Sequence, residues 1–321
     1  MIRLSELSHV EAREKLRGGL PAFVLVNPVE YHGPHLPLRT DAIISFGLMS
    51  DLAERLGGAP ILGADLEVGV EPVPGPGTRS VSFETVCSLA ADTVDALIDL
   101  GAKGLVLMTF HGSPLHSVAL SDAVARARAR GVPAIAPLNL LMTRLRDMMP
   151  SDLEGFREAV GRASDPRRAE ALLSELPTDY HAGFFETSLV LHYSPSSVAS
   201  FHSRLRPCPP IRPVPRLERW SRRTTGALSR ELKFAALGLG WYQLDPFPGY
   251  TGQPAMATAS AGESFARALT DLFEAPTRKV LREGAEPPAP IMEWTRTLTL
   301  RGRIQGIPKV RPAPLEALLL D

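Results

Sequence analysis

The sequence predicts an α/β protein of three layers, in which helices cover both faces of a mostly parallel central sheet. Apolar runs and amphipathic segments alternate from about residue 20 to about residue 140. The apolar runs are uniformly hydrophobic instead of alternating with polar residues, which is typical of strands buried on both faces. Hydrophobic residues make up 44% of the 321 residues and charged residues 22%, an ordinary balance for a globular protein with a sizeable core.

The first elements carry clear boundary signals. The segment "SHVE" (8–11) has the pattern of a capping box and predicts the start of a short amphipathic helix. The apolar run "PAFVLVNP" (21–28) lies between prolines and predicts a buried strand. Helical periodicity then covers 41–58 and ends at a pair of glycines, which is a common helix stop.

The next segments continue the alternation of strand and helix. The same pattern predicts a strand within 59–70, a helix over 88–104, a strand over 104–110, a helix over 115–131 and a strand over 132–139. In such sheets ligands bind beyond the carboxyl ends of the strands. His111 and the segment 29–41 both follow predicted strands, so we expect them to lie at that edge.

The second half is less regular. We predict one domain over 1–275, with polar insertions near 141–178 and 194–248, and an apolar helix near 184–193. A glycine-rich turn followed by a helix closes the domain. Residues 276–321 form an extension punctuated by prolines, which wraps either the body of the protein or a neighbouring subunit.

Composition excludes several classes of protein. Formal net charge is zero, which argues against a nucleic acid or an anionic membrane surface as partner. No apolar run approaches the ~18 residues of a membrane-spanning helix, and the N-terminus lacks the apolar core of a signal peptide. The two cysteines, Cys87 and Cys208, form no CxxC pair and fit a reducing compartment. The sequence therefore predicts a cytoplasmic protein.

The segment "VEYHGPHLPLRTD" (29–41) holds the first candidate functional residues. Glu30, His32 and Asp41 offer ligand types for Zn²⁺ or Mn²⁺. Glycine and proline keep the segment from becoming a helix, and its stiffness lowers the entropy of fixing several ligands. Taken alone, Asp41 could be an ordinary helix cap, and His35 could do no more than form a hydrogen bond with a backbone group. Together they favour a metal site.

Several motifs resemble the creatininase family of binuclear metal hydrolases. The segment at 30–41 resembles the family signature "ExHGPHLPxxTD". Four further motifs follow in the family order, namely "GPGT" (75–78), "HG" (111–112), "HAGFFETS" (181–188) and "GxxGQPxxATxxxGE" (249–263). The resemblance covers about residues 20–275.

The resemblance implies two divalent metal ions, Zn²⁺ and/or Mn²⁺. It implies that Glu30, Asp41 and His111 bind one ion, and that His32, Asp41 and Glu186 bind the other, with Asp41 shared. Two divalent ions, three carboxylates and a bridging hydroxide would sum to neutrality, and a metal-bound water ionises near neutral pH. Glu186 and His181 are the expected catalytic residues, His181 as the group that transfers protons.

We expect supporting roles for several other residues, and some positions depart from the family pattern. We expect His35 to support the loop, and Gly112 and Gly183 to let the backbone approach the ions. Ser113 and Pro114 replace the usual segment after His111, and Pro177 and Thr178 replace a Trp-Asp pair. Activity on creatinine itself is therefore not expected. His9, His116, His192 and His202 are expected to be structural or on the surface, and Phe184, Leu189, Val190 and Leu191 to belong to the core.

The predicted activity is hydrolysis of a C–N bond in a small cyclic amide, a formamide or a short peptide, through a metal-bridging hydroxide. The resemblance also implies a homo-oligomer, often a hexamer. Two alternatives stay open at this point. One is a non-catalytic scaffold that binds a metal or ligand on the same fold, and the other is a one-metal deaminase in which Glu186 has no role.

Overall fold

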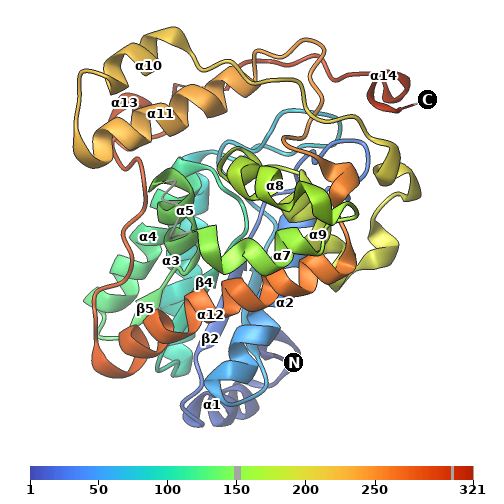
Figure 1. The fold of residues 1–321 in the computed structure, drawn as a ribbon. Coiled ribbons are helices and arrows are strands. Elements are labelled where there is room, and N and C mark those ends of the chain that lie inside the picture. The colour runs from blue at the N-terminus through green and yellow to red at the C-terminus, as the bar shows by residue number, and fades with distance from the viewer. Residues whose placement is uncertain (148–152, 305–306, 321) are drawn as a thin grey trace.

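The computed structural model describes residues 1–147, 153–304 and 307–320. Residues 148–152 of the first predicted insertion and 305, 306 and 321 of the extension lie outside this range. A central sheet with helices on both sides dominates the fold (Figure 1). Its strand order is β1-β3-β2-β4-β5, and all its strand pairings are parallel, which confirms the predicted fold class. The strands are β1 (Ile2–Arg3), β2 (Ala22–Val26), β3 (Ile61–Leu66), β4 (Leu105–Met108) and β5 (Ala134–Ile135).

Side chains of β2 alternate between two hydrophobic cores, one on each face of the sheet. Phe23 and Leu25 belong to one core, whereas Ala22, Val24 and Val26 belong to the other. The first core is shared with α2 (Thr40–Leu56), α5 (Leu138–Asp147), α9 (Phe184–Tyr193) and α12 (Ala259–Glu283). The second is shared with α1 (His9–Arg17), α3 (Phe83–Leu100) and α4 (Pro114–Ala129). Because both faces are covered, every residue of β2 is buried, which explains its unbroken apolar run.

Helix ends follow local chemistry. The predicted capping box is present, because Glu11 N donates to Ser8 Oγ at 3.3 Å and Ser8 N donates to Glu11 Oε2 at 2.9 Å. Helix α2 ends at Gly57, whose φ of 105° suits glycine. Helix α3 begins earlier than its predicted start at 88, because Ser82 Oγ accepts from Thr85 N and caps the helix at Phe83.

Strand β5 is shorter than predicted. The sequence predicts a strand over 132–139, but only Ala134–Ile135 pair with β4. Pro133 and Pro137 bracket this strand, and a proline has no N–H to donate to a neighbouring strand. Helix α5 starts immediately afterwards, at Leu138.

Apart from α11 (Gly226–Trp241), which has 16 residues, the insertions consist of short elements. The first holds α7 (Arg157–Gly161), α8 (Ala169–Glu175), η2 (Glu154–Phe156), η3 (Pro166–Arg168) and η4 (Leu176–Thr178). The second holds α10 (Pro215–Ser221), α11 (Gly226–Trp241), η5 (Pro195–Ser197) and η6 (Ser200–Arg204). In the described part of the chain, no helix is both long and apolar enough to cross a bilayer.

The C-terminal extension lies against the protein's own body. Helix α12 continues through Pro276 to Glu283 and ends at Gly284, whose φ is 67°. The chain then passes beside α11, through the short helix α13 (Thr295–Leu298), and crosses the top of the molecule to α14 (Leu315–Leu318) (Figure 1). Bridges join Pro312 to Phe247 and Leu319 to Leu205. Of the two alternatives for the extension, the structure therefore shows contact with its own body.

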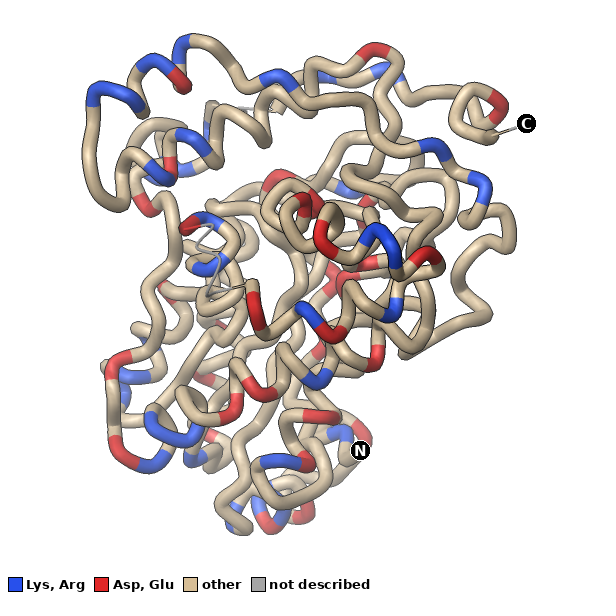
Figure 2. The backbone as a smooth tube through the Cα atoms, viewed as in Figure 1, with Lys and Arg blue, Asp and Glu red and all other residues tan. Residues whose placement is uncertain are grey.

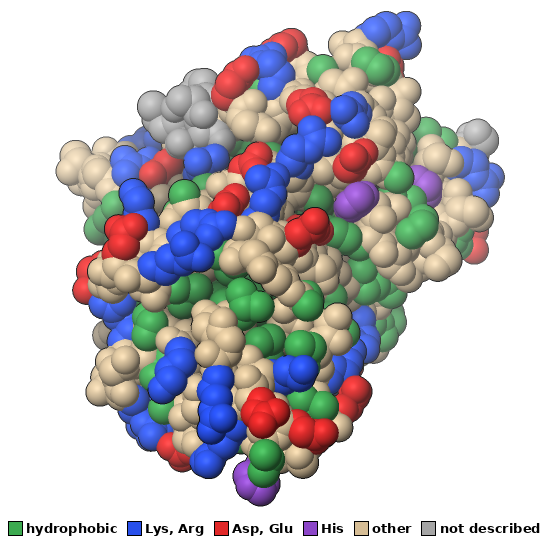
Figure 3. Space-filling model, turned by 90° about the horizontal axis from the view of Figure 1, so that it is seen from below, with side chains coloured by type: hydrophobic (Ala, Val, Ile, Leu, Met, Phe, Trp, Pro, Cys, Tyr) green, Lys and Arg blue, Asp and Glu red, His purple; other side chains and the backbone are tan. Residues whose placement is uncertain are grey.

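Charged residues of both signs are interspersed along the chain (Figure 2). Seen from below, acidic and basic side chains alternate with hydrophobic ones on the surface (Figure 3). Many of these charges form exposed pairs, such as Arg126 with Asp95 and Arg303 with Glu84. The two signs are therefore mixed over the molecule, and they balance to a formal net charge of zero.

Candidate metal centre

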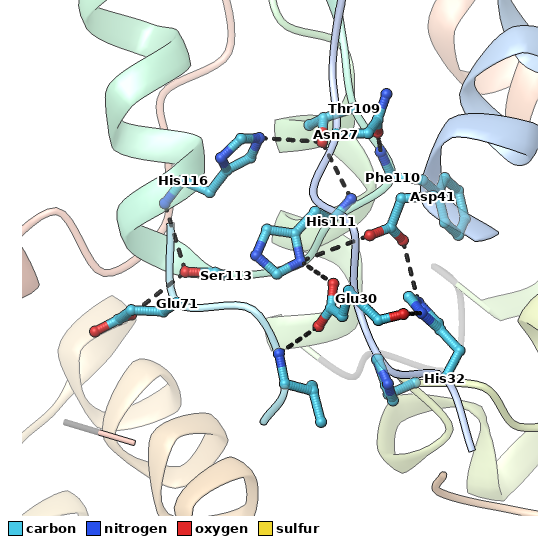
Figure 4. Close-up of polar contacts among 12 residues, drawn as sticks. Asn27, Glu30, His32, Asp41, Glu71, Thr109, Phe110, His111, Ser113 and His116 are labelled. Atoms are coloured by element: carbon cyan, nitrogen blue, oxygen red, sulfur yellow. Dashed lines mark hydrogen bonds and ion pairs between the residues drawn. The ribbon is translucent and has the colours of Figure 1, made fainter. Parts of the chain in front are cut away.

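The candidate ligands meet where β2 and β4 end and where α2 and α9 begin. Figure 4 shows four of them, Glu30, His32, Asp41 and His111. Glu30 and His32 follow β2, and His111 follows β4, its neighbour in the sheet. Asp41 lies in the first turn of α2. His181 and Glu186 come from the start of α9, far along the chain. The carboxyl ends of adjacent parallel strands and two helix starts therefore bring these side chains to one place.

Asn27 connects the two strand exits. Its Oδ1 accepts from Phe110 N at 3.1 Å and from Ser45 Oγ at 2.9 Å. One amide oxygen thus joins the ends of β2 and β4 to α2. Thr109 adds a second constraint, because its Oγ1 accepts from His111 N at 3.1 Å. These bonds fix the backbone that carries the candidate ligands.

His32 faces two carboxylates. Its Nε2 lies 3.3 Å from Asp41 Oδ1 and 3.8 Å from Glu186 Oε2. Its Nδ1 lies 3.1 Å from the carbonyl oxygen of Glu30. A carbonyl can only accept, so Nδ1 carries the hydrogen and Nε2 presents its lone pair to the carboxylate side in the neutral ring.

His111 has the same arrangement with the nitrogens exchanged. Its Nε2 donates to the carbonyl oxygen of Val70 at 2.8 Å. Its Nδ1 lies 2.9 Å from Glu30 Oε2 and 3.8 Å from Asp41 Oδ2. Asp41 is thus the carboxylate that lies between the two imidazoles.

His181 stacks on His32, with ring centroids 4.2 Å apart. Its Nε2 donates to the carbonyl oxygen of Tyr31 at 2.9 Å, which leaves Nδ1 as the nitrogen with a free lone pair. Each of the three imidazoles therefore donates one N–H to a backbone carbonyl, which fixes its tautomer and ring orientation. Histidines that bind metal ions are commonly oriented by such a second hydrogen bond.

The side chains of the site are almost completely buried. The exposed fraction is 1% for Glu30, His32 and Asp41 and at most 6% for the other three residues, His111, Glu186 and His181. Glu30 Oε1 accepts from Val73 N at 2.6 Å, and Glu186 Oε2 accepts from Ala182 N at 2.5 Å. Glu30 Oε2, Asp41 Oδ2 and His32 Nε2 are buried without a hydrogen bond in the described structure. Unpaired buried atoms of this kind are costly unless another group satisfies them.

The donor set fits divalent ions. Glu30, His32 and Asp41 offer ligand atoms within 4.8 Å of one another, and so do His32, His181 and Glu186. Imidazole nitrogen and carboxylate oxygen suit Zn²⁺ and Mn²⁺. Ions placed between these groups would also satisfy the unpaired atoms, so the residues present fit the cofactor that the resemblance implies.

Burial and mutual charge perturb the carboxylates in opposite directions. Burial raises the pKa of Glu30 above its ordinary value, although His111 opposes the shift. Burial likewise raises the pKa of Glu186 to about 8, against the effect of His32. For Asp41, burial would raise the pKa, but the neighbouring His32 holds it well below the ordinary value. Asp41 is therefore the most firmly ionised of the three.

The imidazoles divide into two kinds. Burial would lower the pKa of His32, but Asp41 and the other carboxylates raise it to about 10. Burial would likewise lower the pKa of His111, but Glu30 raises it to about 9. The pKa of His181 falls well below its ordinary value, because it is buried and lies beside His32. His181 is thus the neutral imidazole of the group at pH 7.

The remaining histidines lie outside this cluster. His35 lies behind the loop, with its Nε2 2.9 Å from Thr187 Oγ1, which agrees with the expected supporting position. His116 is fully buried and bonds to Val26 O and Thr109 Oγ1, so of the two expected roles it has the structural one. The expected core stripe is present, since Phe184, Leu189 and Val190 are buried and Leu191 packs against them.

The two glycines have different surroundings, and their expected approach to the ions stays a prediction. A Cβ on Gly183 would lie 1.8 Å from Asp179 Oδ1, so this glycine makes room for Asp179, which accepts from Phe184 N at the start of α9. A Cβ on Gly112 would meet only Met142, no closer than 3.7 Å. None of these nearest atoms belongs to a candidate ligand.

Sequence reasoning missed the aromatic side chains around the site. Trp241, at the end of α11, packs against His181 with ring centroids 5.2 Å apart. It lies in the second insertion, where no sequence motif marks it. A cavity of about 300 Å³ opens beside the cluster, with Glu30, His111, His181 and Glu186 in its lining.

Comparison with known proteins places this geometry in context. The family model "Creatininase: Creatinine amidohydrolase" matches residues 5–275. The curated creatinine amidohydrolase of Pseudomonas putida is 24% identical over 208 residues, which cover 61% of this chain and 73% of that protein. Among solved structures, a glutamate-to-glutamine variant of creatininase described as Zn-Zn type has a TM-score of 0.59 at 20% identity, covering 87% of this chain and 98% of that one. A structure titled "Creatininase Mn" has a TM-score of 0.56 at 19% identity, with 88% and 99% covered.

Proposed function

The chain belongs to the creatininase family, and on that premise we propose that it is a binuclear metal-dependent amidohydrolase. The family supports amidohydrolase activity in general terms. The number of ions, the roles of individual residues and the substrate are our proposal. The main support is that three buried carboxylates lie beside three imidazoles, and that each imidazole donates a hydrogen bond to a backbone carbonyl.

We assign Glu30, Asp41 and His111 to one ion and His32, Asp41 and Glu186 to the other. Asp41 lies between His32 and His111, with distances of 3.3 and 3.8 Å, which suits a shared ligand. The relatives whose titles mention Zn and Mn support these metals as candidates. When bound, such ions polarise a carbonyl and lower the pKa of water.

His181 is the proposed proton-transfer residue. Its neutral ring keeps Nδ1 free, because Nε2–H is held by the Tyr31 carbonyl. In hydrolysis, water adds to the amide carbon, the C–N bond breaks, and the amine leaves with a proton. His181 accepts a proton from the attacking water and returns it to the departing nitrogen, so no net proton is lost at the residue. Trp241 and His32 hold the ring between them and limit its rotation.

The proposed substrate is a small cyclic amide, a formamide or a short peptide. A homo-oligomer and a cytoplasmic location stay predictions. The first test is metal analysis of protein purified without chelators. About two Zn²⁺ or Mn²⁺ ions per chain support the proposal, and no bound metal with no gain on adding it would favour the non-catalytic scaffold.

Activity provides the second test. A panel of lactams, imidazolones and formamides should show hydrolysis that depends on added Zn²⁺ or Mn²⁺. A Glu186→Gln variant separates the remaining alternative, because a one-metal deaminase would keep its turnover in that variant. Under our proposal the variant loses one ion and most of its activity.

A further inference from the structure

Much of the wall of the cavity beside the metal centre consists of side chains that take no part in the proposed hydrolysis. Part of its lining comes from the metal centre, namely Glu30, His111, His181 and Glu186. The rest of the lining is largely aromatic and aliphatic and includes Tyr180, Phe234, Trp241, Tyr242, Met292 and Trp294. Among the residues that the structure describes, neither lysine nor arginine lines this cavity. At about 30 Å³ per water in the liquid, 300 Å³ corresponds to the volume of roughly ten water molecules.

The C-terminal extension supplies part of this apolar wall. Met292 and Trp294 line the cavity, and both lie beyond residues 5–275, the part that matches the family. Their part of the wall therefore lies outside the region that the family model matches. Helix α11, within the second insertion, supplies an adjoining part through Phe234, Ala235 and Trp241.

The wall is held in place by one glutamate of α11. Glu231 Oε1 accepts from Met292 N at 3.1 Å, and Glu231 Oε2 accepts from Trp294 Nε1 at 2.8 Å. Its side chain is only 12% exposed. Farther along, Arg296 pairs with Asp122 of α4 at 2.7 Å. The indole of Trp294 is thus fixed in position before any ligand arrives, which lowers the entropic loss on binding.

One acidic group lies in this mostly apolar cavity outside the metal centre. Glu71 lines the cavity and has a φ of 53°, in the left-handed region that glutamate rarely adopts. Its Oε2 accepts from Ser113 Oγ at 3.3 Å, and among the described residues it forms no salt bridge. Figure 4 shows its carboxylate pointing away from His111 and Glu30. A partly buried carboxylate that pairs with no cation among the described residues suits a ligand that brings a hydrogen-bond donor.

We propose that the substrate is an amide with a bulky apolar substituent that packs against the wall of Met292 and Trp294 and carries an N–H or ammonium donor toward Glu71. This inference rests on the proposed function and adds its substrate class. The C-terminal extension is then the part of the chain that selects the substrate. Apolar groups leave water favourably in such a cavity, whereas a small polar amide gains little from it.

Two formamides of different size test the apolar wall. N-methylformamide and N-benzylformamide share the scissile group and differ in the apolar substituent. We expect N-benzylformamide to bind at least tenfold more tightly in ligand-observed NMR titrations, both with Zn²⁺ supplied and with metal withheld. Trp294→Ala should remove most of this difference, and Trp294→Phe should restore most of it.

Trp220→Ala is the matched control, because Trp220 is 45% exposed on α10 and does not line the cavity. It should leave both affinities unchanged. If Trp294→Ala does not fold, Ala235→Leu places a bulkier side chain inside the cavity and should weaken only N-benzylformamide. Equal affinities for the two formamides in the unmodified protein would overturn the inference, as would equal effects of the two tryptophan variants.

A third formamide tests Glu71. N-(4-aminomethylbenzyl)formamide adds an ammonium group to the larger probe. We expect it to bind severalfold more tightly than N-benzylformamide, and Glu71→Gln should abolish that gain while leaving N-benzylformamide unaffected. An ammonium group that gives no gain would remove Glu71 from the proposal.

The outcomes distinguish the proposed amidohydrolase activity from the proposed substrate class. Selective binding of the larger formamides without any hydrolysis would refute the amidohydrolase and keep the apolar pocket. Hydrolysis of N-methylformamide and N-benzylformamide with equal KM would keep the amidohydrolase and refute the substrate class.

Discussion

The metal centre and the apolar wall of the neighbouring cavity are built in different ways. The centre draws its residues from short motifs at strand exits and helix starts, where the fold brings them together. The wall draws its residues from α11 and the extension, which lie 50 residues or more apart along the chain and carry no motif. Chemistry at the centre therefore depends on a few polar contacts, whereas selection at the wall depends on packing. Variants in the two regions should separate loss of turnover from loss of affinity.

The largest effect is expected at Asp41. Replacing it by alanine removes the carboxylate that lies between His32 and His111 and leaves both imidazoles without that partner. Loss of a residue that hydrogen-bonds to a metal ligand typically lowers metal affinity or activity about 10–100-fold. Loss of a shared ligand should therefore reduce kcat/KM by more than about 100-fold. Metal analysis should find both ions weakened or lost. Full metal content in this variant would contradict the assignment.

His181→Ala should give the next largest effect. Removing a general acid–base group typically lowers the rate about 10²–10⁴-fold. Metal content should stay unchanged, because we place His181 beside the ions and not among their ligands. The structure also groups one of its nitrogens with His32 and Glu186, so this experiment decides between two roles. Loss of one ion would make His181 a ligand.

Glu231→Ala should act on the wall and leave the centre intact. It removes the acceptor for Met292 N and Trp294 Nε1, which leaves a partly buried indole N–H without its partner. Such a loss costs about 1–3 kcal/mol of unfolding free energy, measurable by urea denaturation. KM for N-benzylformamide should rise while metal content is unchanged. A matching fall in metal content would show that the wall and the centre are not independent.

The smallest effect is expected far along the extension. Arg303 pairs with Glu84 at 3.0 Å, but their side chains are 73% and 52% exposed. Exposed pairs of this kind contribute about 0–1 kcal/mol. Arg303→Ala should therefore change neither stability nor KM appreciably. A clear rise in KM would mean that the outer contacts of the extension also position Trp294.

The fold was largely predictable because its signals are local. Unbroken apolar runs marked β2 and β4, and the Ser8 capping box marked the start of α1. Errors occurred where a local signal competed with another one. The strand predicted over 132–139 is only Ala134–Ile135, because prolines interrupt pairing. Helix α3 begins at the Ser82 cap, and its buried face already includes Phe83 and Val86, ahead of the predicted start at 88. The family match over 5–275 confirms the resemblance that the motifs indicated.

The site was predictable in its residue types and only partly in its geometry. The motifs named the six side chains that the structure brings together. They did not identify the carbonyls of Tyr31 and Val70 that set the tautomers of His181 and His111. Backbone acceptors have no sequence signal, because every residue carries one. The role expected for Gly183 stays a prediction, and the structure adds a reason for glycine there that the motif did not indicate, since a Cβ would clash with Asp179 and Thr251.

The sequence by itself determined the layered α/β fold, the family and the set of ionisable residues around the candidate ions, because short apolar runs, caps and motifs report local preferences. Only the tertiary structure decided that the extension lies against its own body, that Trp241 packs on His181, and that Trp294 and Met292 complete the cavity. These contacts join residues with no pattern in common. They depend on the packing of whole elements, and the physical reason is that packing is specified by shape in three dimensions and not by spacing along the chain.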